Sequence, residues 1–128
     1  MGDISEHFDR SEFECKDNCG FVAVDIELIS VLEDLRSYFG GPITITSGCR
    51  CQKHNTEIPG AAPNSMHTKG IAVDFKTKNS AKRQVHSRYI YDYLDRKYPN
   101  KYGIGLYNNR IHLDVRSDRA RWSMVNAD

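Results

Sequence analysis

The spacing of apolar residues along the chain predicts two amphipathic helices. In the first, apolar side chains recur at helical spacing as Leu28, Leu32, Leu35 and Phe39. Asp25 is placed to cap the N-terminus and Gly40-Gly41-Pro42 ends the pattern, so we expect a helix over residues 25–39. The second apolar stripe predicts a helix over residues 80–98, capped by Ser80 and closed by Pro99; it comprises Val85, Tyr89, Ile90, Tyr93 and Leu94.

Short β-branched or alternating runs predict four strands. These runs cover residues 43–46, 71–75, 103–106 and 111–115, and residues 107–110 are expected to join the last two strands as a hairpin. We expect a short helical turn over residues 119–122. Residues 1–24 have an irregular pattern, with Phe8, Phe13 and Phe21 as anchors to the core. The sequence therefore predicts an α+β fold, with helices packed on one side of a small antiparallel sheet.

Composition and charge narrow the functional classes. With 39% hydrophobic and 27% charged residues, and no internal repeat or linker, residues 1–128 are expected to form one globular domain. A formal net charge of +1 argues against binding to nucleic-acid phosphates. No apolar run approaches the length of a membrane span, and residues 1–10 lack the apolar centre of a secretion signal. We therefore expect neither nucleic acid nor membrane as a partner.

Two segments carry the residues that suggest chemistry. Side chains alternate along a strand, so Ala72 and Asp74 share one face, with His67 in the loop before them. His112 and Asp114 likewise share a face, while Ile111, Leu113 and Val115 fill the other. Two histidines and one carboxylate, with one position left open, form the ligand set of a catalytic zinc hydrolase.

These segments also carry a resemblance to a known family. Ser65-x-His67-x-x-Gly70-x-Ala72-x-Asp74, followed by His112-x-Asp114, resembles the zinc peptidases of the D-alanyl-D-alanine carboxypeptidase type, family M15. The single-domain members found in bacterial and phage cell-wall enzymes are the most similar. Further stretches agree in the family's order: Ser11-Glu12-Phe13, Ile45-Thr46-Ser47-Gly48-Cys49-Arg50, His54-Asn55, Pro63-Asn64-Ser65, Gly103-Ile104-Gly105 and Arg121-Trp122.

The resemblance implies a fold, a cofactor and a reaction. The fold would be that shared by hedgehog and D-Ala-D-Ala peptidases. Zn²⁺ would be held by His67, Asp74 and His112, with a water in the fourth position whose pKa zinc lowers to about 7. The substrate would be peptidoglycan stem peptides or their cross-links, cut by a carboxypeptidase or an endopeptidase.

The remaining catalytic roles are less closely defined by the motifs. Some relatives place a glutamate base three positions before the last histidine, where this chain has Asn109. Asp114 is then the nearest carboxylate, acting either as the general base or as a partner that orients a ligand. Arg50 matches the family arginine that binds the substrate carboxylate or polarises the scissile carbonyl. His54 is read as structural, and His7 and His86 as having no chemical role; Trp122, Tyr102 and Tyr107 are expected in the core or the cleft wall.

A second class of function stays open at this point. The same fold can keep its metal and lose turnover, acting as a cell-wall-binding or virion structural module. In either case we expect a monomer. Because no secretion signal is seen, a phage-encoded endolysin released from the host cytoplasm would explain access to the wall.

Four cysteines form two close pairs, Cys15 with Cys19 and Cys49 with Cys51. Strain disfavours a bond between Cys49 and Cys51. Cross-bonds between the pairs, a second structural zinc and reduced thiols packed together all remain possible. Each requires the N-terminal turn to lie against the loop that carries Arg50, so we predict that the two pairs lie close together.

Overall fold

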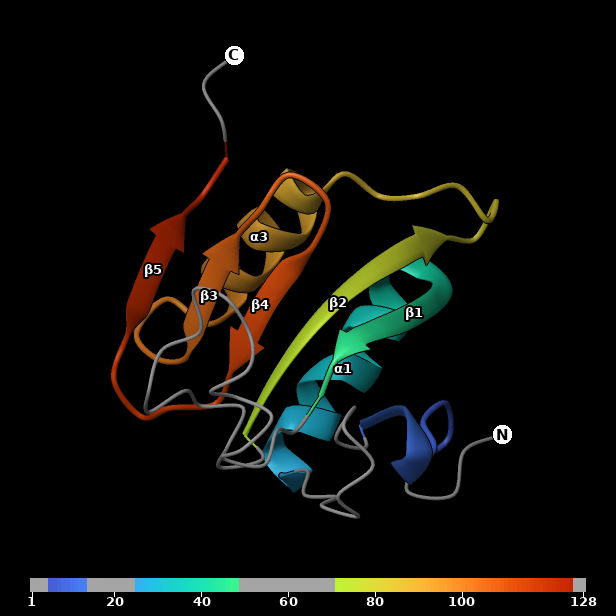
Figure 1. Cartoon of the computed structure of the whole chain (residues 1–128), viewed down its shortest axis with the longest axis horizontal. Helices are drawn as coiled ribbons and strands as arrows, with labels where there is room; N and C mark the ends of the chain where they lie inside the picture. Colours follow the sequence, from blue (N-terminus) through green and yellow to red (C-terminus); the bar gives the residue numbers. More distant parts are fainter. Residues whose placement is uncertain (1–4, 14–24, 49–70, 126–128) are drawn as a thin grey trace.

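The fold was examined in a computed structural model that describes residues 5–13, 25–48 and 71–125. Its centre is a sheet of five strands in the order β1-β2-β4-β3-β5. Two helices, α1 (Ile26–Phe39) and α3 (Ser87–Lys97), lie behind this sheet (Figure 1). The strands are β1 (Gly40–Ser47), β2 (Ala72–Asn79), β3 (Gly103–Leu106), β4 (Ile111–Asp114) and β5 (Ala120–Ser123), and a short 3-10 helix, η1, spans Arg10–Phe13. The predicted α+β class is confirmed.

Helix α1 forms as the sequence predicted. The Asp25 side chain accepts a hydrogen bond of 2.8 Å from the Glu27 backbone N–H, which satisfies one free donor of the first turn. Gly40 ends the helix with φ at 79°, a left-handed conformation that a residue with a Cβ adopts at a cost. The chain then enters β1 directly. The predicted helix, its cap and its stop are therefore confirmed.

The sheet is mixed because of its last strand. Strands β1, β2, β4 and β3 pair antiparallel, whereas β5 pairs parallel to β3. The predicted helical turn over residues 119–122 is wrong. Arg121 instead contacts α3 and the residues that follow it, donating to Asp95 at 2.7 Å and to the carbonyls of Tyr98 and Tyr102 at 2.7 and 2.6 Å. These contacts hold the segment extended against β3.

The second helix begins later than predicted. Residues 80–86 do not belong to it, because β2 runs on to Asn79 and a turn follows. The Asn79 side chain accepts from the N–H groups of Ala81 and Arg83, and Val85 donates its N–H to Thr77 on β2. His86, rather than Ser80, caps the helix by accepting from the Arg88 N–H at 3.1 Å.

The core lies between the sheet and the helices. Alternate residues of the central strands are fully buried there: Val73, Phe75, Ile104, Ile111 and Leu113. They pack in one cluster with Leu28, Leu32 and Leu35 of α1 and with Ile90 and Leu94 of α3. Phe8 and Phe13 are each 1% exposed and join this cluster, so their predicted role as anchors is confirmed. Phe21 lies outside the described residues.

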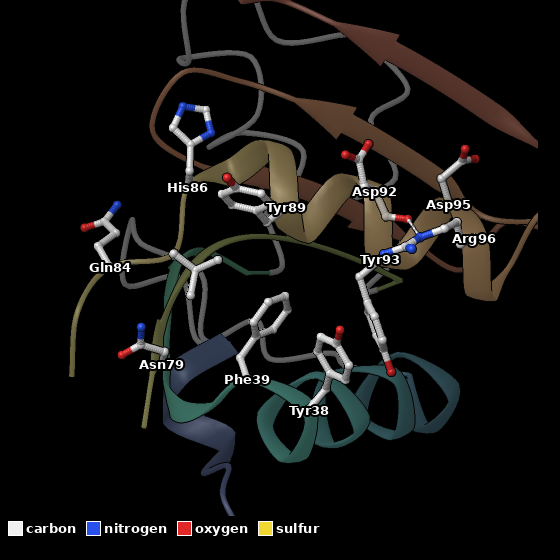
Figure 2. Close-up of a pocket in the computed structure, with 11 residues that line it drawn as sticks. Tyr38, Phe39, Asn79, Gln84, His86, Tyr89, Asp92, Tyr93, Asp95 and Arg96 are labelled. Carbon is white, nitrogen blue, oxygen red and sulfur yellow. Dashed lines mark hydrogen bonds between the residues drawn. The ribbon is translucent and has the colours of Figure 1, made fainter. Parts of the chain in front are cut away.

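The two helices also contact each other. The Tyr93 hydroxyl of α3 donates to Asp34 of α1 at 2.6 Å, and Lys97 pairs with the same carboxylate at 2.7 Å. An open groove lies beside this contact (Figure 2). Its lining comes from the end of α1, from residues 79–86 and from α3, so it lies on the helix side of the sheet. Across the described parts of the chain, neither helix has the length and apolar character needed to span a membrane.

Candidate metal centre

The face of the sheet opposite the helices carries Asp74, His112 and Asp114, which the sequence singled out. Strand register places Asp74 of β2 opposite His112 of β4, His112 opposite Gly105 of β3, and Gly105 opposite Trp122 of β5. Neighbouring residues in a strand point to opposite faces, and the intervening row is the buried core. The register therefore brings residues from four strands into one line across the face opposite the helices.

Asp74 and His112 form the closest pair in this line. The Asp74 Oδ1 lies 3.0 Å from the His112 Nδ1, and the two side chains are 11% and 10% exposed. Burial lowers the pKa of His112, but its hydrogen bonds to Asp114 and Asp74 outweigh this and raise the pKa above its ordinary value. A carboxylate and an imidazole thus lie within hydrogen-bonding distance in a mostly buried position.

Asp114 lies on the far side of the same imidazole. Its Oδ2 is 2.8 Å from the His112 Nε2, and its side chain is fully buried. Arg116 donates to both carboxylate oxygens at 2.6 Å, and the N–H groups of Gly103 and Arg116 donate to Oδ1 at 3.1 and 3.2 Å. Burial raises the pKa of Asp114, but the bonds from His112 and Arg116 hold it well below its usual range.

Two glycines of β3 make room for these side chains. A Cβ built at Gly103 would lie 2.4 Å from the Asp114 Oδ2, and one built at Gly105 would lie 2.5 Å from the Trp122 indole. Both distances are shorter than real Cβ contacts allow. The Gly103-x-Gly105 motif therefore has a physical reason: the strand must lack side chains where Asp114 and Trp122 cross it.

Aromatic and cationic side chains surround the pair. The Trp122 ring lies 5.1 Å from the His112 ring at an angle of 45°, and its Nε1–H donates to the Tyr107 hydroxyl at 3.1 Å. Arg110 lies over the Tyr107 ring, and its Nε is 4.0 Å from the Asp74 Oδ2. Trp122 and Tyr107 thus form a wall of the site, whereas Tyr102 is buried and donates to Glu27.

The structure brings together Asp74, His112 and Asp114, three of the residues that the sequence singled out. His67, Arg50, His54 and the four cysteines lie outside the described residues. Sequence reasoning missed Arg116 and Arg110 as parts of the site. The signal was present, since residues 110, 112, 114 and 116 alternate with the apolar residues of β4 and so face the same side.

One further group of possible metal ligands occurs among the described residues, formed by Glu6, His7 and Glu33. The His7 Nδ1 lies 2.6 Å from Glu33, which also accepts from the Ser5 hydroxyl and the His7 N–H. Glu6 and His7 are exposed. These contacts tie the N-terminal segment to α1, which accounts for the grouping without an ion.

A carboxylate and an imidazole on adjacent strands, backed by a second carboxylate, offer donor types that a metal ion can take. Comparison with known families identifies the class of protein. The sequence model of the peptidase M15 family matches residues 6–114. The chain therefore belongs to the peptidase M15 family, whose members are generally zinc-dependent. Searches among curated proteins and among solved structures found no match.

Proposed function

We propose that this chain is a zinc-dependent peptidase that hydrolyses peptide bonds in the stem peptides or cross-links of peptidoglycan. The observation that carries the proposal is the Asp74–His112 pair, held 3.0 Å apart on the face of the sheet opposite the helices, in a chain of a peptidase family. A peptide is a suitable substrate for this face, since the wall formed by Trp122 and Tyr107 borders the pair.

The described residues fit the proposed metal. Carboxylate oxygen and imidazole nitrogen are both ordinary zinc donors, and Asp74 and His112 already direct one of each toward the same space. His67, which precedes β2 in the sequence, would complete the set. When bound, zinc would supply a Lewis acid that polarises the peptide carbonyl and activates water.

Asp114 is better suited to positioning His112 than to accepting a proton. A carboxylate only accepts hydrogen bonds, so Asp114 would keep a proton on the His112 Nε2, and a bound metal would take the place of the proton on Nδ1 beside Asp74. Both oxygens of Asp114 already accept bonds from Arg116, and its side chain has no exposed surface. We therefore propose that Asp114 fixes the orientation of the imidazole, as carboxylates behind metal-bound histidines do.

The other expectations from the sequence become parts of this proposal. Arg50 would bind the substrate carboxylate or the scissile carbonyl through its planar guanidinium. The protein would act as a monomer on the bacterial wall, reached by release from a phage-infected cell. The alternative is a wall-binding or virion module without turnover, which would bind the wall but release no fragment from it.

The test is digestion of defined muropeptides by the zinc-loaded protein, followed by mass spectrometry of the fragments. We expect one bond type to be cut, activity to disappear with a chelator and return with zinc, and His112→Ala to be inactive. His86→Ala, which removes a histidine on the helix side, is the matched control and should stay active. A folded, zinc-replete protein that binds the wall but releases no fragment would establish the non-catalytic alternative instead.

A further inference from the structure

Arg110 occupies the rim of the Asp74–His112 pair. It ends the turn between β3 and β4, and its side chain is 40% exposed. The Nε lies 4.0 Å from the Asp74 Oδ2, and the guanidinium carbon lies 4.0 Å from the centre of the Tyr107 ring. A cation is therefore held beside the carboxylate that is expected to bind the metal.

The turn that carries Arg110 is fixed at several points. The Tyr107 N–H donates to the Arg110 carbonyl at 3.2 Å, and the Ser87 hydroxyl at the start of α3 donates to the Tyr107 carbonyl at 2.5 Å. The Tyr107 hydroxyl in turn accepts from Trp122, which packs against His112. Arg110 is thus stacked on a ring that is itself tied to the site, so little side-chain freedom remains to be lost on binding.

A comparison with Arg116 indicates what Arg110 can do. Arg116 forms two bonds of 2.6 Å with the buried Asp114, so its charge is matched within the protein. Arg110 reaches Asp74 only at 4.0 Å, the outer limit of an ion pair. The guanidinium lies over the Tyr107 ring, and its N–H groups lie in its own plane, a planar fork that suits the two oxygens of a carboxylate.

We propose that Arg110 is a specificity-determining residue whose guanidinium binds a carboxylate of the peptide substrate next to the Asp74–His112 pair. The proposal rests on the proposed peptidase function and assigns a second cation, on a different segment from Arg50. The carboxylate is either the free C-terminus of the peptide or an acidic side chain near the bond that is cut. Peptides that lack it at that position would bind less tightly.

The experiment uses a stem peptide that ends in D-Ala-D-Ala, its C-terminal amide, and a version in which isoglutamate is replaced by isoglutamine. Affinity for non-hydrolysable forms is measured by calorimetry with zinc-loaded protein, and KM and kcat with the cleavable forms. We expect Arg110→Gln to weaken binding of the recognised carboxylate peptide at least about tenfold, the scale of one charged hydrogen bond. One of the two modified peptides, the amide or the isoglutamine form, lacks that carboxylate. Its affinity should differ less than about twofold between Arg110→Gln and wild type.

Arg96→Gln is the matched control, because it removes the same charge from α3 on the helix side, where Arg96 donates to the Asp92 carbonyl. It should leave all affinities unchanged, and Arg110→Lys should restore only part of the preference. Equal weakening for every peptide, unchanged binding, or a loss of zinc from Arg110→Gln would overturn the proposal, and so would a wild-type protein that binds no peptide. A wild-type protein that shows the preference but does not cut would contradict the peptidase function alone.

Discussion

Arg116 and Asp114 form a two-bond ion pair behind the Asp74–His112 pair. The Nε–Oδ1 and Nη2–Oδ2 distances are both 2.6 Å, and the carboxylate is fully buried while the guanidinium side chain is 28% exposed. Asp114 also faces the His112 Nε2, so one arginine outside the expected ligand set supports the carboxylate that we propose orients His112.

Removing this arginine leaves a buried charge without its main partner. We expect Arg116→Gln to destabilise the protein by about 3 kcal/mol, the scale for breaking a buried pair, and to lower zinc affinity about 10- to 100-fold. Urea denaturation and chelator competition measure the two effects. Arg119→Gln is the control, since Arg119 pairs with Asp95 at a more exposed position and should cost at most about 1 kcal/mol. Equal effects from both variants would contradict the special role of Arg116.

Asp114→Asn separates positioning from proton transfer. If Asp114 orients His112, the variant should bind zinc about 10- to 100-fold more weakly but recover most of its kcat when zinc is saturating. If Asp114 is the general base, kcat should stay depressed by about 10²-fold or more even with zinc fully bound. The measurement is kcat as a function of free zinc, and we expect the first outcome.

Gly105→Ala tests the close approach of β3 and Trp122. The added Cβ would lie 2.5 Å from the indole, so Trp122 must move off His112. We expect a loss of about 1–3 kcal/mol in stability. Trp122 is the only tryptophan in the chain, so its fluorescence reports the displacement directly. The smaller ring of Trp122→Phe should relieve the overlap, and no recovery of stability in that double variant would show that the strain lies elsewhere.

The ion pairs of Asp95 with Arg119 and Arg121 predict that the free energy of unfolding depends on pH. Hydrogen bonds from Arg121 and Arg119 hold the pKa of Asp95 below its ordinary value, despite an opposing effect of burial. A depressed folded pKa gives stability that is present above the unfolded pKa, about 3.9, and is lost as pH falls through the folded value. Asp95→Asn should therefore be less stable than wild type near pH 7, with the difference vanishing at low pH.

Urea midpoints between pH 2 and pH 7 would measure this dependence. Asp92→Asn is the control on the same helix, since its exposed side chain forms no ion pair within the described residues. The Asp92 variant should differ from wild type by the same small amount at every pH. A difference for Asp95→Asn that grows as the pH falls would contradict the sign of the argument.

Local periodicity was enough to identify several elements. The α1 helix, with Asp25 as its cap and Gly40 at its end, is encoded by residues close together in the chain. The alternation in β4 correctly placed His112 and Asp114 on one face and Ile111 and Leu113 on the other. Long, strongly periodic segments are the ones in which local pattern and tertiary packing favour the same structure.

The errors fall where distant contacts override the local pattern. The apolar stripe that begins at Val85 suited a helix starting at Ser80, yet Val85 bonds to Thr77 of β2 and the helix begins at Ser87. Residues 119–122 form β5 because Arg121 bonds to Asp95 and to backbone carbonyls of a distant turn. No spacing within those segments specifies these partners.

The sequence by itself determined the family, the α+β class and the faces on which Asp74, His112 and Asp114 lie. Only the tertiary structure decided that Asp74 and His112 stand 3.0 Å apart, that Arg116 secures Asp114 and that Arg110 borders the site. The physical reason is that alternation along a strand determines, from the local sequence alone, which side chains share a face. Register between strands depends on how the whole core packs, and no single strand encodes that packing.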